Sequence, residues 1–301
     1  RDASDRSIDR STGRASERPA SRPAGTMLRE RRVLALGAAS GRSLAWAAAR
    51  AWRAQGAEVA IGVQDHARFG SRFEALARDE PELWGDRPPL VVECDVDRDE
   101  SIAACVQAVG EAFGGSLDAL LHGIAFAPRE SLRGDTPVTD TNRAEFLKAM
   151  DTSVYSFVAV TRAFRAQLEA AAAKRQGTSS VMTLTFDGSQ RVVPGYGVMG
   201  PAKGALEACA RYMAVELGPS GLRVNSISAG PINTLAARGI PNFTRLRQQA
   251  VASAPLHEPL DARHVGDMAA FLASDAAAAV TGQTLFVDSG ASLVTLSSPP
   301  S

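Results

Sequence analysis

Two side chains that could share one chemical step, Tyr196 and Lys203, lie in the stretch GYGVMGPAKGALEACARYMAVEL at residues 195–217. From residue 198 onward apolar residues recur every three or four positions, which predicts a buried helix. Pro201 is compatible only with the first turn of such a helix. Tyr196 would then precede the helix and Lys203 would lie about one and a half turns into it, so that a phenol and an ammonium converge on one small ligand.

The chemistry of this pair indicates a reductase. A lysine close to a phenol lowers the pKa of the phenol, and both groups can hydrogen-bond a sugar hydroxyl or a developing oxyanion. The alternative interpretation is that Tyr196 is a loop aromatic and Lys203 a solvated charge, since both residue types are common at loose spacing.

The elements that would position this pair alternate between strand and helix patterns. Short apolar runs predict strands at 32–36, 58–63, 90–94, 119–123, 180–185, 223–228 and 284–287. Helical patterns occupy 43–55, 68–78, 99–112, 143–173, 198–217 and 262–273. This alternation, with strands apolar throughout, predicts an α/β fold: a single doubly wound Rossmann-type parallel sheet of about seven strands with helices on both faces. Its ligand would lie at the carboxyl ends of the strands.

The loop after the first predicted strand, GAASGRSL at residues 37–44, is suited to a pyrophosphate, although its glycine spacing differs from GxGxxG. Small residues let the backbone approach the phosphates, and the following helix supplies free N–H groups. The second strand ends at Gln64 and Asp65, where an acid can hold the adenosine ribose and favours NADH. Arg42 and Arg68 lie close enough in sequence to keep NADPH as the alternative.

Three further loops complete the predicted ligand site. Asp95, after the third strand, either accepts from the adenine amino group or caps the next helix. The fourth strand leads into GIAFAP at residues 123–128, small residues with one aromatic that suit a flat ring. After the sixth strand, the Gly–Pro turn of SAGPINTLAA at residues 228–237 can reach a nicotinamide amide. Residues 232–252 then form either a substrate lid or an ordinary pair of surface helices.

Bulk composition narrows the classes of function. A chain of 301 residues with 45% hydrophobic content can bury one large core, and we expect a single domain over residues 27–301. A net charge of zero and no basic block in the folded part argue against nucleic acid, and no apolar run of about 18 residues is present to span a membrane. The cysteines lack a CxxC pair and are predicted to be buried thiols in a reducing compartment, and the scattered histidines predict no metal site. These residues are Cys94, Cys105, Cys209, His66, His122, His257 and His264.

Residues 1–26 are mainly Arg, Ser, Ala, Asp and Pro and are predicted to be a disordered leader, with Met27 as an internal start. Their Arg and Ser content suggests a transit peptide, but Asp2, Asp5, Asp9 and Glu17 are acids that such peptides avoid. An expression leader or translated upstream sequence is the equal alternative. We expect a cytoplasmic protein if the source is bacterial, or a plastid stromal one if the leader belongs to a transit peptide.

Taken in order, these motifs resemble the short-chain dehydrogenase/reductases and, within them, the NADH-dependent enoyl-acyl-carrier-protein reductases of fatty-acid synthesis. The resemblance covers about residues 31–296. Its most specific motif is Tyr196-x6-Lys203, since most of the superfamily uses Tyr-x3-Lys and the residue four before Lys203 is Met199. Further matching motifs are GAASGRSLA at Gly37, CDV at Cys94, HGIAFAP at His122, YSFVAV at Tyr155 and RVNSISAGPINTLAARGI at Arg223.

The resemblance implies a role for each matching position. Tyr196 would stabilise the thioester oxygen during reduction of a trans-2-enoyl group, and Lys203 would bind the nicotinamide ribose. Ala127 and Phe186 would contact the substrate. The remaining NADH-binding positions would be Gly37, Ser43 and Leu44 at the pyrophosphate, Gln64 at the adenosine ribose, Asp95 and Val96 at the adenine, Ile124 at the cofactor ribose, and Ile232, Asn233, Thr234, Leu235 and Ala236 at the nicotinamide and lid.

The resemblance also implies partners, and the chain departs from it in three places. A homotetramer is implied, with 143–173 and 198–217 at the interfaces, and the substrate would arrive on acyl carrier protein. Phe186 replaces a family tyrosine, and of the basic residues that would meet the carrier only Arg245 and Arg247 are left. The loops at 81–89 and 170–178 look longer than in typical bacterial members of the family. The alternatives are a reductase of another activated alkene or carbonyl, and a catalytically weak NAD-binding homologue.

Overall fold

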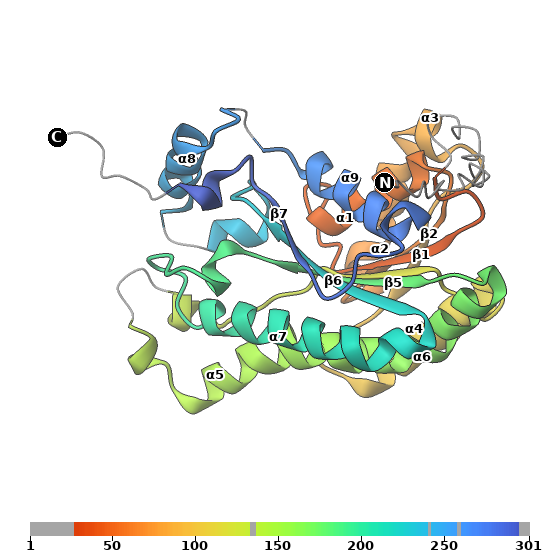
Figure 1. Cartoon of the computed structure of the whole chain (residues 1–301), viewed down its shortest axis with the longest axis horizontal. Helices are drawn as coiled ribbons and strands as arrows, with labels where there is room; N and C mark the ends of the chain where they lie inside the picture. Colours follow the sequence, from red (N-terminus) through yellow and green to blue (C-terminus); the bar gives the residue numbers. More distant parts are fainter. Residues whose placement is uncertain (1–26, 133–136, 240–241, 258–259, 295–301) are drawn as a thin grey trace, which may run out of the picture.

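One parallel sheet organises the computed structural model, which describes residues 27–132, 137–239, 242–257 and 260–294 (Figure 1). Its seven strands have the order β3-β2-β1-β4-β5-β6-β7, which confirms the predicted fold class. The predicted leader at residues 1–26 lies outside the described residues. The strands are β1 (Arg32–Leu36), β2 (Glu58–Val63), β3 (Leu90–Glu93), β4 (Ala119–His122), β5 (Ser179–Thr185), β6 (Leu222–Ala229) and β7 (Thr284–Val287).

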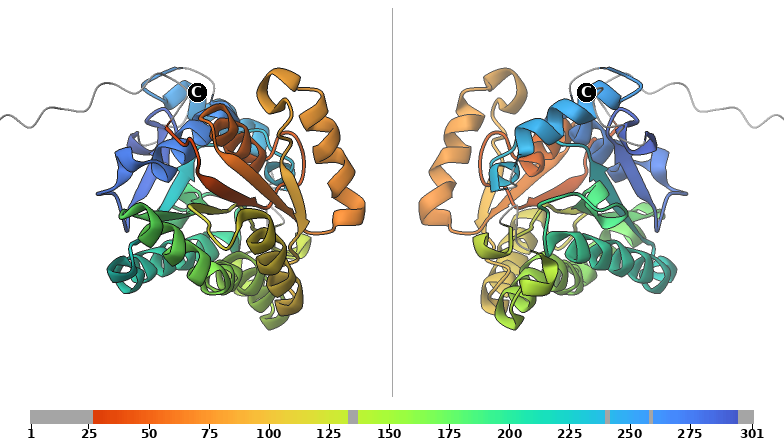
Figure 2. Two further views of the ribbon diagram at one scale, coloured as in Figure 1. Left: turned by 90° about the vertical axis from the view of Figure 1, so that its right-hand side faces the viewer. Right: turned by 90° about the vertical axis from the view of Figure 1, so that its left-hand side faces the viewer.

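Helices cover both faces of the sheet, and the two side views of Figure 2 show the sheet between them. One layer contains α1 (Leu44–Ala54), α2 (His66–Arg78) and α9 (Ala262–Ala273), and the other contains α4 (Asp99–Phe113), α5 (Arg143–Met150), α6 (Ser156–Arg175) and α7 (Met199–Leu217). The short α3 (Pro81–Trp84) follows α2, and α8 (Phe243–Ser253) lies between β6 and α9 in the chain. None of the helices in the described ranges is long and apolar enough to cross a membrane.

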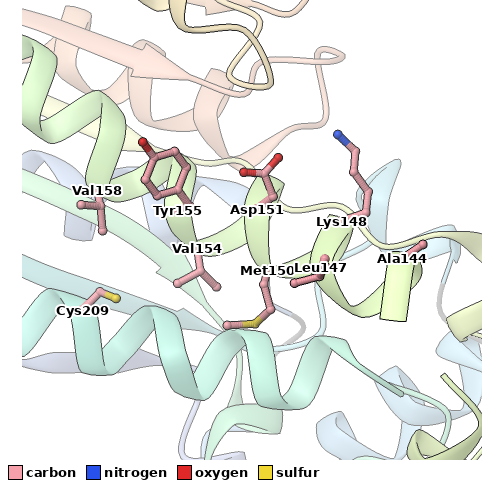
Figure 3. Close-up of a pocket in the computed structure, with 9 residues that line it drawn as sticks. All are labelled: Ala144, Leu147, Lys148, Met150, Asp151, Val154, Tyr155, Val158 and Cys209. Atoms are coloured by element: carbon pink, nitrogen blue, oxygen red, sulfur yellow. The ribbon is translucent and has the colours of Figure 1, made fainter. Parts of the chain in front are cut away.

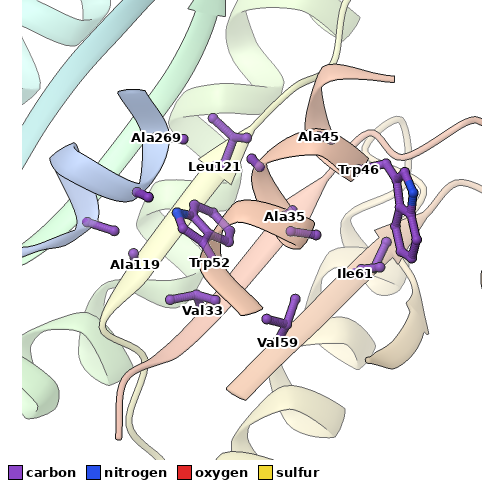
Figure 4. Close-up of a cluster of buried hydrophobic side chains, with 14 of the residues drawn as sticks. Val33, Ala35, Ala45, Trp46, Trp52, Val59, Ile61, Ala119, Leu121 and Ala269 are labelled. Carbon is purple, nitrogen blue, oxygen red and sulfur yellow. The ribbon is translucent and has the colours of Figure 1, made fainter. Parts of the chain in front are cut away.

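The strand period of two divides the buried residues between two cores. Along β1, Val33 and Ala35 belong to the core under α1 and α9, whereas Leu34 and Leu36 belong to the core over α4, α6 and α7. Figure 4 shows the first of these cores, where Trp52 of α1 packs over the strands. Burial on both faces explains why β1 and β2 carry apolar residues without alternation.

Both segments predicted to be long loops contain regular structure. Residues 81–89 include α3, whose Trp84 is buried and stacks on Trp46 of α1 with ring centroids 5.3 Å apart. The 170–178 segment is largely the end of α6, which continues to Arg175. Parts of both segments are therefore helical and not loop, because buried aromatic packing and an alanine-rich helix end order these residues, while their length relative to the family stays a prediction.

The predicted helix at 143–173 is interrupted by a π-helical turn, Asp151–Tyr155, between α5 and α6. Single π turns accommodate one extra residue per turn and often occur at functional sites. Thr152, Ser153 and Val154 of this turn are buried against the neighbouring loops.

The order of the strands reverses between β1 and β4, and a crevice at the carboxyl ends of strands is expected at such a point. Gly37 leaves β1 with φ of +91°, and a Cβ placed on it would lie 2.3 Å from the carbonyl oxygen of Gly123. Only glycine fits this backbone approach, which brings the loops after β1 and β4 together.

Candidate active site

Lys203 lies on the buried side of α7, and its side chain reaches the carboxyl end of β5. Its Nζ donates to the carbonyl oxygen of Leu184 at 2.7 Å, and the residue is 5% exposed. Burial lowers the pKa of Lys203 to about 8, while the nearby charge of Glu207 acts in the opposite direction. An ammonium has three N–H donors, and no second acceptor contacts this one within the described ranges. Two donors are therefore left for a ligand.

Tyr196 lies in the turn before α7 and is 7% exposed. Its ring meets the ring of Phe186 edge-on, with centroids 5.2 Å apart and an interplanar angle of 68°. Burial raises the pKa of the Tyr196 phenol above its ordinary value, so the expected lowering by Lys203 is wrong. The Tyr196 side chain is thus a neutral phenol at physiological pH, able to donate its proton in a hydrogen bond.

The structure brings Tyr196 together with both predicted substrate residues. Ala127, from the loop after β4, is buried in the same small apolar cluster as Tyr196, and Phe186 packs against that cluster. Val198 and Met199, at the start of α7, complete its centre. The loops after β4 and β5 therefore meet at the predicted catalytic tyrosine.

Glu207 is a buried charged residue that the sequence reasoning missed. It is 4% exposed and lies one helical turn after Lys203 on α7. Its Oε1 accepts from Thr185 Oγ1 at 2.7 Å and from Ser189 Oγ at 2.5 Å. The spacing of four residues after Lys203 was the available signal, because it places both side chains on one helix face.

The π-helical turn is hydrogen-bonded to the loop after β4. Ser153 Oγ donates to the carbonyl oxygen of Phe126 and accepts from its N–H, both at 3.0 Å. On the same turn, Thr152 Oγ1 donates to Asp97, which also receives Lys148 Nζ at 2.6 Å. The turn thus contacts the loops that follow both β3 and β4.

His122 ends β4 in full burial and was not predicted to belong to the site. Its Nε2 is 2.8 Å from Ser156 Oγ, and its Nδ1 is 3.4 Å from Thr183 Oγ1. Burial, with the charge of Lys203 as a smaller cause, lowers the pKa of His122 to about 3. The imidazole is therefore neutral and links β4, β5 and α6 behind the lysine.

The predicted pyrophosphate loop leads directly into α1. Ser43 caps this helix: its Oγ accepts from the N–H of Trp46 at 3.4 Å and donates to the carbonyl oxygen of Ser40 at 2.7 Å. Leu44 is the first residue of α1 and is partly buried. The N-terminus of α1 thus lies at the carboxyl ends of the strands, a few residues after Gly37.

The ends of β2 and β3 carry the residues predicted to hold the adenosine. Gln64 is exposed after β2, and Asp65 caps α2 by accepting from the N–H of Arg68 at 3.0 Å. Asp95 follows β3 and is ion-paired with Arg98 at 3.2 Å, so in this structure the carboxylate stabilises the start of the next helix. Val96, beside it, is partly buried.

Arginines gather near the predicted adenosine end. Arg72 Nη1 donates to the carbonyl oxygen of Ala39 at 3.0 Å, and the guanidinium groups of Arg68 and Arg72 lie 5.0 and 5.7 Å from the ring centroid of Phe69. Arg42 is exposed in the loop between β1 and α1. These cations flank the loop after β1.

The loops after β4 and β6 carry the predicted nicotinamide positions. Ile124 lies next to Gly37, because a Cβ on that glycine would be 2.9 Å from Ile124 Cγ1. Ile232 is buried, Thr234 is partly buried and accepts from the N–H of Ala237 at 3.1 Å, and Asn233 and Leu235 are exposed. Ala236 begins a short 3-10 turn, and its side chain lies outside the described part of the structure, as do residues 240–241 of the predicted lid.

Comparison with known proteins gives the family. The family model described as enoyl-(acyl carrier protein) reductase matches residues 37–292. The chain is 38% identical over 264 residues to the NADH-dependent enoyl-[acyl-carrier-protein] reductase FabI of Bacillus cereus, covering 88% of this chain and 97% of the relative. It is 39% identical over 269 residues to the FabI of Escherichia coli K12, covering 89% and 97%.

A solved structure agrees with this assignment. The enoyl-(acyl-carrier-protein) reductase of Anaplasma phagocytophilum, solved in complex with NAD, superposes with a TM-score of 0.81 at 35% identity, over 91% of this chain and 98% of that one. The sheet order, the Tyr196 and Lys203 arrangement and these similarities point the same way. The chain belongs to the enoyl-(acyl carrier protein) reductase family of short-chain dehydrogenase/reductases.

Proposed function

We propose that this protein reduces the trans-2 double bond of an enoyl thioester carried on acyl carrier protein, with NADH as reductant, in fatty-acid synthesis. The observation that carries the proposal is a buried ammonium with spare donors, seven residues after a buried neutral phenol in the turn that leads from β5 into α7. Family membership supports the reaction. When bound, NADH supplies the hydride that the β-carbon of the substrate receives.

The residues present fit a dinucleotide. Gly37 provides a close backbone approach where no Cβ has room, and the N-terminus of α1 begins a few residues later. The proposed contacts are Gly37, Ser43 and Leu44 at the pyrophosphate, Gln64, Asp95 and Val96 at the adenosine, and Ile124 with residues 232–236 toward the nicotinamide. The cap role of Ser43 is compatible with this, because its backbone N–H can still face a phosphate.

Lys203 positions the cofactor in this proposal. Its two unused N–H donors are suited to the ribose hydroxyls, and the bond to Leu184 fixes the direction of the side chain. The lysine needs its proton for both contacts, so binding of NADH should weaken as the pH rises through the pKa of about 8.

Tyr196 is proposed to stabilise the negative charge that reduction places on the thioester oxygen. A neutral phenol in a water-poor site is a strong donor to an oxyanion, and the edge contact with Phe186 holds its ring. The α-carbon then takes a proton to complete the product. Ala127 and Phe186 are proposed to contact the acyl chain, because both pack in the cluster around Tyr196.

The carrier protein and the lid are assigned to the segment after β6. Arg245 and Arg247 lie on α8, which has no buried residue and follows the loop that carries the proposed nicotinamide positions. Two cations on one short helix, Arg245 exposed and Arg247 partly buried, suit an acidic carrier surface. We propose that residues 232–252 cover the bound substrate.

We propose that the protein is a homotetramer that associates through α5, α6 and α7. Large apolar side chains lie exposed on the side of these helices that faces away from the sheet, here called the α5–α7 outer face: Phe146, Leu147, Tyr155, Tyr212 and Val215. An open hollow of about 710 Å³ lies in this face between α5, α6 and α7 (Figure 3). An apolar patch of this kind marks an interaction surface.

The test is NADH oxidation with trans-2-enoyl-acyl carrier protein, followed by absorbance. We expect turnover in the native chain, a loss of about a hundredfold or more in kcat for Tyr196→Phe, and normal NADH binding in that variant. Phe186→Tyr should retain or raise turnover, because the added hydroxyl restores the residue seen in the family. NADH binding by fluorescence without reduction of any enoyl thioester would instead favour another activated substrate or a catalytically weak homologue.

A further inference from the structure

Glu207 is a charged side chain buried beside the groups that carry the proposed reaction. It is 4% exposed and lies on α7, four positions after Lys203. Removing a carboxylate from water is costly unless the charge is paired and hydrogen-bonded. Its burial therefore needs compensating contacts, and the nature of those contacts indicates what the residue does.

The compensating contacts come from the segment between β5 and α7. Thr185 Oγ1 and Ser189 Oγ both donate to Glu207 Oε1, at 2.7 and 2.5 Å. These hydroxyls stand at the two ends of residues 185–189, so one carboxylate oxygen holds both ends of the segment. Hydrogen bonds to a charged acceptor are shorter and stronger than neutral ones.

Residues 185–189 are in direct contact with Tyr196. The Phe186 ring meets the Tyr196 ring at 5.2 Å, and a Cβ on Gly188 would lie 2.6 Å from Tyr196 Cδ1. The segment also packs on α7, where a Cβ on Gly200 would be 3.2 Å from the carbonyl oxygen of Gly188. Any shift of these residues would therefore move the tyrosine.

The same carboxylate affects Lys203 in two ways. Leu184, whose carbonyl oxygen accepts from Lys203 Nζ, directly precedes Thr185, which Glu207 anchors. The negative charge of Glu207 also favours the ammonium form of Lys203 against the opposing effect of burial. Both effects keep a charged donor at the proposed ribose site.

We infer that Glu207 is a positioning residue of the reductase site, whose carboxylate holds residues 185–189 against Tyr196 and supplies the buried negative charge opposite Lys203. The inference rests on the proposed function, because it assigns Glu207 a role through the two residues proposed to act. It predicts that the charge of Glu207, and not only its hydrogen bonds, is required.

Other charged groups also face this region. Asp187 lies within residues 185–189, and its pKa is raised mainly by burial; Arg191 at 3.8 Å opposes this, and the charges of Asp288 and Glu207 add to it. Asp288, after β7, accepts from the N–H groups of Gly290 and Ser292. His122 is neutral, because its pKa is about 3. Because the charge of Glu207 also raises the pKa of Asp187, only the change above a pH of about 8, where Lys203 titrates, reports the effect of Glu207 on the lysine.

The test compares Glu207→Gln with the native chain. Glutamine keeps a side-chain oxygen that can accept from both hydroxyls but removes the charge. We expect kcat/KM for NADH in the native chain to fall above a pH of about 8, where Lys203 loses its proton, and NADH affinity measured by fluorescence to fall with it. In Glu207→Gln both curves should shift to lower pH by about one unit.

A second variant separates hydrogen bonding from charge. The double variant Thr185→Val with Ser189→Ala removes both donors and keeps the carboxylate. We expect kcat to drop about tenfold as residues 185–189 loosen. The pH at which kcat/KM for NADH falls on the alkaline side, here called the alkaline limb, should not change. Glu216→Gln, at an exposed site on the same helix, is the matched control and should behave as the native chain.

Superimposed pH profiles for Glu207→Gln and the native chain would overturn the inference. If Glu207→Gln does not fold, Glu207→Asp replaces it: the charge is kept but the reach is shorter, so kcat should fall with the limb in place, and a native kcat would contradict the proposal. Failure of the proposed function is distinct, because the native chain itself would then reduce no enoyl thioester, while the NADH binding curves would still test Glu207.

Discussion

At the scale of single residues, burial raises the pKa of Tyr196 and lowers the pKa of Lys203. The two changes suit the side chains to different tasks. The phenol is held neutral, and in the proposed reaction it donates to an oxygen that becomes negative, while the lysine keeps a proton that is easily lost above neutral pH. The sequence alone suggested this pair, and its catalytic role stays a prediction. The sequence could not predict that the pKa of Tyr196 is raised, because burial of Tyr196 depends on Phe186 and Ala127, which reach it only in the folded chain.

Replacing Lys203 by Met should separate cofactor binding from stability. The pKa of Lys203 falls from 10.5 to about 8 on folding, so between these values the unfolded chain binds more protons and the free energy of unfolding rises with pH. Relative to Lys203→Met, the native apoprotein should therefore gain stability over this window, while its NADH affinity falls. Urea unfolding and NADH fluorescence, each across the pH range, measure the two trends. Parallel trends in both proteins would mean that another group titrates.

At the scale of elements, apolar runs were enough to predict the strands. All seven predicted strand ranges agree with the structure within one residue at each end, because buried parallel strands are apolar on both faces. The π-helical turn at Asp151–Tyr155 was not predictable in the same way, since it inserts one residue into a continuous helical pattern. Its position is set by tertiary contacts, chiefly those of Ser153 with the Phe126 backbone and of Thr152 with Asp97.

Ser153→Ala should loosen the loop after β4 without unfolding the domain. The substitution leaves the N–H and carbonyl of Phe126 without their partner, at a cost of about 1–3 kcal/mol in the free energy of unfolding. We expect KM for the enoyl substrate to rise several-fold, because Ala127 follows directly. Ser179→Ala is the control. Ser179 is also a buried, hydrogen-bonded serine, but it lies at the amino end of β5, away from the proposed site. An equal effect of both variants on KM would argue that general destabilisation, not the loop, is responsible.

At the scale of the whole molecule, the carboxyl ends and the amino ends of the parallel strands, here called the carboxyl edge and the amino edge of the sheet, carry different groups. The carboxyl edge carries the proposed site, whereas the amino edge carries a buried ion network in which Asp118 is paired with Arg31 at 3.6 Å and with Arg175, and Arg31 is also paired with Asp275. Arg31 and Asp118 are 3% and 2% exposed. This separation predicts that stability and catalysis respond to different substitutions.

Asp118→Asn should therefore destabilise the fold and spare the site. The substitution removes the buried carboxylate that Arg31 and Arg175 share and leaves Arg31 paired with Asp275 alone, which should cost up to about 3–5 kcal/mol. We expect a lower urea midpoint with KM for NADH unchanged, because Asp118 lies before β4 at the edge away from the proposed cofactor. Asp267→Asn, exposed on α9, is the control and should match the native chain in both measurements. A raised KM in Asp118→Asn would show that the two edges are coupled.

The α5–α7 outer face predicts how copies of the chain associate. Tyr212 and Val215 are 72% and 78% exposed on α7, which is unusual for large apolar side chains of a buried amphipathic helix. Light scattering should give a mass about four times the 31.6 kDa of one chain, and Tyr212→Glu with Val215→Glu should lower it, because two carboxylates on each helix would be desolvated and repel across an isologous contact. Leu256→Glu, an exposed apolar site outside this face, should leave the mass unchanged. A native mass near that of one chain would refute the tetramer, whereas a native tetramer unaffected by the α7 charges would place the interface elsewhere on the molecule.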